Sequence, residues 1–189
     1  LNLIDSVGET VFRLDVLGNA EFDGTVKAKS IDAEVINATG VNQIYRAGEA
    51  GLVAGDVVAF DENGNVRRSS ASNQKGLVGV VSPGSGLMIG ENASDGVPVA
   101  AAGRVMVRVS AQNGPIQPGD YLTSSDTPGV AMKATGGGPI IGVSSGYFSD
   151  PGENTVEMTV MSSLMASNFG GEYEEFQNRI STIEDQITD

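Results

Sequence analysis

The chain has 189 residues, 40% of them hydrophobic, and its 24 acidic residues outnumber 11 basic ones, which gives a net charge of -13. This charge opposes binding to nucleic acid or to an anionic membrane surface. The chain lacks Cys and His, which excludes disulfides, thiolate or histidine-dependent catalysis, and Cys or His metal sites. No apolar run reaches the roughly 18–20 residues of a membrane span, so we expect no membrane insertion. From the net charge and the missing residue types we expect no nucleic-acid partner and no cofactor.

The N-terminal segment, residues 10–36, alternates between apolar and polar residues. Phe12 and Leu14 share one face, and Arg13 and Asp15 share the other. This period of two predicts half-buried β-strands. The strands are too short to form a two-layer domain alone. We therefore predict that residues 1–40 form a strand-repeat segment of a fibre shaft, which needs neighbours from elsewhere in the chain or from other chains.

An internal duplication begins near Val41. We predict a β domain over residues 41–166 that contains two similar units, at about 41–110 and 111–163. The first unit ends with the alternating strand "GRVMVRVS" at 103–110. The pair Gly55-Asp56 matches Gly119-Asp120 at an offset of 64, and Gly79 matches Gly142 at an offset of 63. Two landmarks in nearly the same register indicate a repeat rather than coincidence.

Each unit is predicted to contain a strand, a tight turn at the Gly-Asp pair, a hairpin, a buried strand and a final alternating strand. Gly55 and Gly119 allow a positive φ, and the neighbouring aspartate can accept hydrogen bonds from main-chain N–H groups. We therefore interpret Asp56 and Asp120 as turn residues rather than catalysts. The pair Asn63-Gly64 predicts a type I′ hairpin turn.

The C-terminal residues 167–189 are predicted to form a coiled-coil helix. Apolar side chains fall at the a and d positions of a heptad, and a possible salt bridge between parallel helices joins a g and an e position. The predicted interface residues are Tyr173, Phe176, Arg179, Ile180, Ile183, Glu184 and Ile187. Isoleucine at consecutive a and d positions favours three or four strands, so we predict a homotrimer. The alternative is an amphipathic helix that packs on its own β domain.

Two runs carry a resemblance to a known class of domains. They are "GLVGVVSPGSGLMIG" at 76–90 and "VPVAAAGRVMVRVSAQNGPIQPGDYLTSSDTPGVAMKAT" at 97–135. Together they resemble the C-terminal β domains of phage tail fibres and neck appendages, of the peptidase G2 or intramolecular chaperone class, which also occur in fibre-like bacterial surface proteins. The resemblance covers about residues 45–165. The stretch 14–31 resembles the strand repeats that precede such domains. The resemblance implies a trimeric fibre end, extracellular or on a virion.

We therefore expect a mainly β structural protein of a fibre or filament, located on a virion or a cell surface. It would assemble as a homotrimer, and its exposed loops would contact a host-surface glycan or protein. One alternative is a self-cleaving intramolecular chaperone, but no defined catalytic motif of that class aligns with this chain, so we expect no enzyme. A second alternative is a head-to-tail filament in which residues 1–40 donate strands to the next protomer.

Overall fold

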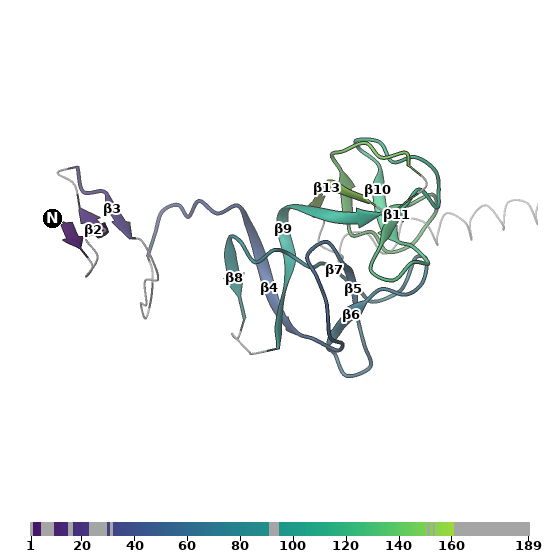
Figure 1. The fold of residues 1–189 in the computed structure, drawn as a ribbon, viewed down its shortest axis with the longest axis horizontal. Coiled ribbons are helices and arrows are strands. Elements are labelled where there is room, and N and C mark those ends of the chain that lie inside the picture. Colours follow the sequence, from purple (N-terminus) through teal and green to yellow (C-terminus); the bar gives the residue numbers. More distant parts are fainter. Residues whose placement is uncertain are drawn as a thin grey trace, which may run out of the picture. The chain divides into compact units, whose positions relative to one another are not determined.

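The computed structural model describes residues 2–4, 10–14, 17–22, 30, 32–90, 95–150, 152 and 154–160. Every regular element in these ranges is a β-strand, which confirms the predicted mainly β class (Figure 1). The chain divides into two compact units, Leu1–Asn37 and Ala38–Asp189. Within the described ranges no helix could cross a membrane. The predicted helix at 167–189 and the predicted domain end at 166 lie outside the described residues.

The N-terminal unit contains three short antiparallel strands in the order β1-β2-β3. These are β1 (Asn2–Ile4), β2 (Thr10–Leu14) and β3 (Ala20–Phe22). Phe12 lies opposite Leu3 in β1 and opposite Phe22 in β3. Gly18, with φ 87, lies in the connection between β2 and β3. The unit is thus a single small sheet, with strands of 3, 5 and 3 residues.

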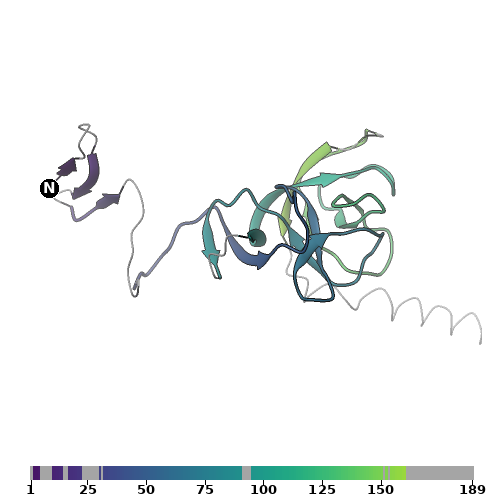
Figure 2. The ribbon, with the colours of Figure 1, turned by 60° about the horizontal axis from the view of Figure 1, so that its bottom comes forward.

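The larger unit forms two sheets from short strands around one long strand, β9. Its strands are β4 (Gly40–Arg46), β5 (Val57–Phe60), β6 (Val66–Arg68), β7 (Leu77–Val80), β8 (Leu87–Ile89), β9 (Gly96–Val109), β10 (Tyr121–Ser124), β11 (Ala131–Lys133), β12 (Gly142–Ser144) and β13 (Asn154–Val160). One sheet has the order β11-β10-β12-β13-β9-β4-β8 and the other β6-β5-β7. Because β11 also pairs with β9, the strands β9 to β13 close into a barrel-like ring. Figure 2 shows this curvature.

The two halves of the larger unit pair their strands in the same way. In the first half β5 lies between β6 and β7, and in the second β10 lies between β11 and β12. Val58 of β5 is opposite Gly79, and Leu122 of β10 is opposite Gly142. These are the two glycines that match in the sequence. Gly79 and Gly142 thus occupy corresponding positions in the strand register of the two halves.

Isolated bridges extend the correspondence between the two halves. Ala47, which directly follows β4, pairs in parallel with Val66 of β6. In the same way, Val109 at the end of β9 pairs in parallel with Ala131 of β11. Val81 also pairs with β9, at Val99. The first half thus forms an incomplete ring, in which single bridges replace two of the strand pairings of the second half.

The long strand β9 belongs to both halves. Its residues 96–103 pair with β4, and its residues 104–109 pair with β13. The sequence analysis placed 103–110 at the end of the first unit, whereas the structure pairs these residues mainly within the second. The alternation of buried and exposed residues is interrupted at 101–104, all of which are exposed. This interruption hides the continuity of the strand from a pattern-based prediction.

A shared core holds the two halves together. Its main cluster includes Val57 and Val80 of the first half and Val107, Leu122 and Met158 of the second, all essentially inaccessible to solvent. A smaller cluster lies within the first half and contains Val58, Val66, Val81 and Val99. Burial of this apolar surface is the main stabilising contribution to such a fold. The two halves therefore form one structural unit.

Candidate functional site

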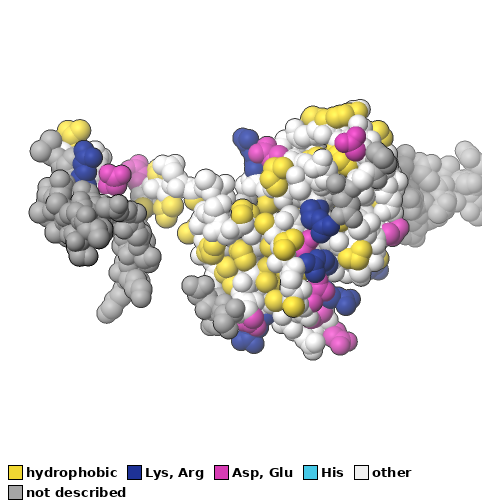
Figure 3. Space-filling view, viewed as in Figure 1, with side chains coloured by type: hydrophobic (Ala, Val, Ile, Leu, Met, Phe, Trp, Pro, Cys, Tyr) yellow, Lys and Arg dark blue, Asp and Glu magenta, His cyan; other side chains and the backbone are white. Residues whose placement is uncertain are grey.

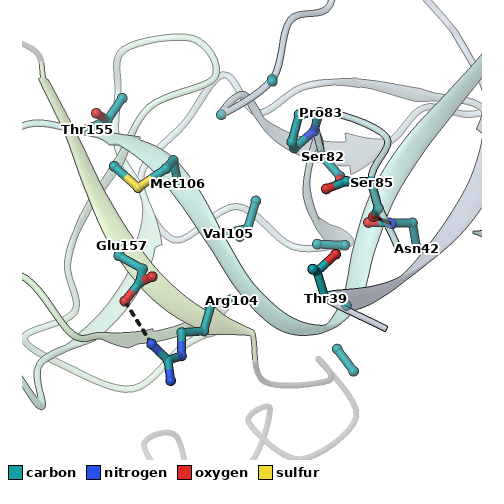
Figure 4. Close-up of a pocket in the computed structure, with 15 residues that line it drawn as sticks. Thr39, Asn42, Ser82, Pro83, Ser85, Arg104, Val105, Met106, Thr155 and Glu157 are labelled. Atoms are coloured by element: carbon teal, nitrogen blue, oxygen red, sulfur yellow. Dashed lines mark hydrogen bonds and ion pairs between the residues drawn. The ribbon is translucent and has the colours of Figure 1, made fainter. Parts of the chain in front are cut away.

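A pocket of about 400 Å³ lies beside the middle of β9. Figure 4 shows Thr39, Asn42, Ser82 and Ser85 gathered on one side of it, and Arg104 on the other. Arg104 and Glu157 are the charged residues among those that line it. The closest atoms of the two, Nη1 and Oε2, are 3.6 Å apart. The lining therefore carries no net charge and is mostly apolar, with four hydroxyl side chains, those of Thr39, Ser82, Ser85 and Thr155.

The polar side of the pocket is held in place by its own hydrogen bonds. Asn42 is 2% exposed, and its Nδ2 donates to the main-chain oxygen of Ser85 over 2.6 Å. Ser82 Oγ accepts from the N–H of Gly84 over 3.2 Å. At Gly86, with φ 93, an added Cβ would lie 2.4 Å from the main-chain oxygen of Gly40, so this loop crosses β4 at a distance that only glycine permits. The wall is thus preformed.

The first predicted Gly-Asp turn adjoins the pocket, because Gly55 is part of its lining. Gly55 has φ 95, as the third residue of a type II turn requires. The main-chain N–H of Asp56 donates to Val53 O over 3.1 Å, and Asp56 Oδ2 accepts from Val53 N–H over 3.0 Å. Side chain and main chain therefore close the same turn.

Asp56 is also the centre of a buried ion-pair network. Its side chain is fully buried, and its two oxygens lie 2.9 Å from Arg68 Nε and 2.7 Å from Arg108 Nη1. Arg68 makes a second ion pair, with Glu49, over 2.7 Å, and it donates to Gly51 O. Because Arg68 belongs to β6 and Arg108 to the second half of β9, the carboxylate of Asp56 joins the two halves of the unit.

The second predicted turn repeats this local geometry without the burial. Gly119 has φ 93, and Asp120 Oδ2 accepts from Gln117 N–H over 2.8 Å. Lys133 Nζ lies 2.9 Å from the same oxygen. The hydrogen bond from Lys133 lowers the pKa of the Asp120 carboxyl, partial desolvation opposes this, and the Gln117 N–H lowers the pKa further. Asp120 therefore stays charged in the folded protein at neutral pH.

The turn at Asn63-Gly64 differs from the predicted type I′ hairpin. Gly64 has φ 79, but Asn63 does not have a positive φ, and a type I′ turn needs one at both central residues. Instead, Asp61 Oδ1 accepts from the N–H groups of Asn63 and Asn65, over 2.8 and 2.9 Å. The aspartate before the turn thus organises the five-residue connection, and only Gly64 takes the left-handed conformation.

A further polar cluster joins the β6–β7 connection of the first half to loops of the second half. Asp126 accepts from Ser72 Oγ over 2.8 Å and from Gln112 Nε2 over 2.7 Å. Among the described residues no group of three or more His, Cys, Asp or Glu side chains is placed to hold a metal ion. The Asp126 carboxylate accepts hydrogen bonds from side chains of neighbouring loops, which is typical of an aspartate that holds loops together.

Neither the arginine partners of Asp56 nor the pocket was predicted from the sequence. Arg68 could have been found from the repeat, because it occupies the place of Lys133: Val58 faces Arg68, and Leu122 faces Lys133. Arg108 had no such indicator. The predicted interface residues lie outside the described residues; they are Tyr173, Phe176, Arg179, Ile180, Ile183, Glu184 and Ile187.

Comparisons with known proteins give a partial likeness in fold. No protein-family model and no curated protein matches the chain. The crystal structure of the C-terminal fragment of gene product 12 of bacteriophage phi29 matches with a TM-score of 0.47 and 13% identity, over 64% of this chain and 99% of that fragment. The pre-mature gene product 12 of phi29 matches with a TM-score of 0.47 and 14% identity, over 80% of this chain and 24% of that one. At these values the likeness says nothing of function.

Proposed function

We propose that the chain is a structural fibre or filament protein of a virion or cell surface that assembles as a homotrimer. The N-terminal unit, Leu1–Asn37, carries the proposal. A unit of fewer than about 40 residues usually needs disulfides, a metal or association with other chains to be stable. The chain contains no Cys and no His. Association with other copies is therefore the means of stabilisation that this composition favours.

The predicted C-terminal helix supports the trimer. Its apolar residues recur with spacings of 3, 4, 3 and 4, and isoleucines at consecutive a and d positions favour more than two helices. An isolated helix of this length is marginal in water, so the stripe needs an apolar partner. In the proposed assembly that partner is the same helix in two sister chains.

The contacts that Asp56, Asp120 and Asp126 make support a structural rather than an enzymatic role. A catalytic acid or base must be able to exchange a proton with a substrate. Asp56 is enclosed by two arginines, and Asp120 and Asp126 accept hydrogen bonds from turn and loop groups. These are contacts that hold loops together. We propose no catalytic activity for the described β unit.

The pocket supports a second role, binding of a host-surface glycan. Its lining, which has no net charge and is mostly apolar with a few hydroxyl groups, suits an uncharged ligand such as a neutral sugar. Titration with a panel of neutral oligosaccharides, followed by NMR, should shift resonances of the pocket residues. Arg104→Ala should weaken the response, and Arg67→Ala, a substitution at another exposed arginine, should leave it unchanged. Shifts spread evenly over the surface would argue against the pocket.

The solution mass of the full chain tests the trimer. Analytical ultracentrifugation should give three times the chain mass of 19.4 kDa. Ile180→Asp together with Ile183→Asp should dissociate the trimer, because unpaired carboxylates are costly to bury. Thr182→Asp, which places the charge outside the a and d positions, is the matched control. A single-chain mass for the wild type, or an unchanged mass for the double variant, would contradict the proposal, and a growing polymer would favour the head-to-tail filament.

A further inference from the structure

One end of the seven-stranded sheet carries no charge. It is formed by β8 and by the residues of β4 (41 and 43–45) and of β9 (97, 98 and 101–103) that are exposed or half-buried, and none of these residues is Asp, Glu, Lys or Arg. We call this surface the neutral sheet end. Figure 3 shows hydrophobic and uncharged atoms over this part of the larger unit. Its neutrality is unusual in a chain with a net charge of -13.

The strand β8 exposes its apolar residues on both faces. Leu87, Met88 and Ile89 are 42%, 44% and 54% exposed, and successive side chains of a strand point to opposite faces. Among the described strands, β8 pairs with β4 alone. Edge strands of soluble proteins are usually protected by charged residues or proline, and β8 has neither. It is therefore available to pair or pack with another chain.

The middle of β9 is open as well. Ala101, Ala102 and Gly103 are all exposed. In this stretch β9 pairs with β4, and its pairing with β13 begins only at Arg104. Small side chains also allow a neighbouring backbone to come close. The neutral sheet end thus combines an apolar edge with an exposed stretch of small residues that borders the pocket at Ala102.

We propose that a neighbouring copy of the chain packs on the neutral sheet end. The inference rests on the proposed homotrimer. Copies that each carry a net charge of -13 repel one another over most of their surface, and contact costs least where the surface is uncharged. A basic partner would gain nothing from this surface. The predicted helical bundle would hold the copies at a high effective concentration, so a modest apolar contact suffices.

Added charge on β8 tests the proposal. Leu87→Glu together with Ile89→Glu should raise the dissociation constant of the trimer roughly tenfold or more, measured by analytical ultracentrifugation over a dilution series. Tyr121→Glu together with Tyr147→Glu adds the same charge at residues that are 50% and 64% exposed elsewhere on the unit, and it should change the constant by less than about twofold. Circular dichroism checks that both variants fold.

Hydrogen exchange provides a test that leaves β8 unaltered. The amides of Leu87–Ile89 should exchange more slowly in the wild-type trimer than in the dissociated Ile180→Asp, Ile183→Asp variant. Equal exchange in the two proteins would overturn the proposal. A trimer that β8 substitutions leave intact would also overturn it, while the proposed trimeric fibre would stand. A wild type that stays a single chain at every concentration would overturn both.

Discussion

The two Gly-Asp turns have the same local geometry in different surroundings. Gly55 and Gly119 have φ 95 and 93, and each aspartate accepts the N–H of the residue three positions earlier, over 3.0 and 2.8 Å. Asp56 is fully buried, whereas the side chain of Asp120 is 20% exposed. Asp56 contacts two arginines and Asp120 one lysine.

The difference shows how a repeated turn acquires a second role. Arg68 and Lys133 occupy equivalent positions and pair with the aspartate of their own half. Arg108 comes from the other half, and its N–H also donates to Gly55 O over 3.0 Å. A carboxylate that closes a turn in one half therefore becomes, once the other half covers it, a link between the two.

The largest effect is expected for removal of the buried carboxylate. Asp56→Ala should lower the free energy of unfolding by about 3 kcal/mol, since it leaves two arginines without their partner. This is the lower end of the cost of breaking a buried ion pair, because Arg68 and Arg108 are partly exposed. Asp120→Ala should cost about 1 kcal/mol, as for an exposed pair. Urea denaturation measures both. Equal losses would show that burial between the halves adds nothing to the turn.

The matching glycines of the buried strands come next. At Gly142 an added Cβ would lie 2.4 Å from the main-chain oxygen of Thr159, whereas at Gly79 the closest atom would be Val99 Cγ1 at 3.0 Å. Gly142→Ala should therefore destabilise by about 3 kcal/mol through the clash with the backbone. Gly79→Ala should destabilise by about 2 kcal/mol, because the φ of 155 at Gly79 adds backbone strain to the milder contact. Thermal unfolding followed by circular dichroism gives the order. The reverse order would mean that the backbone strain at Gly79 outweighs the clash at Gly142.

A smaller difference is expected between the turn glycines themselves. Alanine at either position takes the left-handed conformation at a cost of about 1 kcal/mol. At Gly55 the new Cβ would also lie 3.3 Å from Arg108 Cγ, while at Gly119 nothing lies within 4 Å. Gly55→Ala should therefore be the more destabilising in urea denaturation. If Gly119→Ala were worse, the contact with Arg108 would not be tight.

The smallest effect is the pH dependence of the exposed turn. The pKa of Asp120 in the folded protein lies below its ordinary value of 3.8, so above that pH the folded state is favoured by the charged carboxylate. This contribution is lost as the pH falls below 3.8 and through the lower folded value. Asp120→Asn should flatten the acid side of the stability curve. A curve with the wild-type slope would show that Lys133 and Gln117 do not hold the charge.

Part of the described structure could be predicted from residues alone. The mainly β class follows from alternation and from the many glycines, and the structure confirms it. The Gly-Asp pairs lie at turns, because only glycine adopts a positive φ freely and a neighbouring aspartate can bond the adjacent main chain. These are short-range properties, which a sequence displays directly.

Other features were missed because they depend on distant residues. Only the second part of β9 was predicted, as the strand 103–110, because the exposed centre of β9 interrupts the alternation and its two ends pair with different partners. The turn at Asn63 was assigned to the wrong type, because Asp61 two residues earlier organises it. The pocket combines residues from β4, β9, β13 and two loops, and no single stretch of sequence indicates it.

The sequence by itself determined the strand class, the repeat and the chemistry of the two Gly-Asp turns, since these depend on backbone preference and on neighbours a few residues apart. Only the tertiary structure decided that Asp56 is fully buried between Arg68 and Arg108 while Asp120 stays partly exposed. Burial and charge compensation depend on which distant strands cover a residue, and two identical local motifs contain no information about that covering.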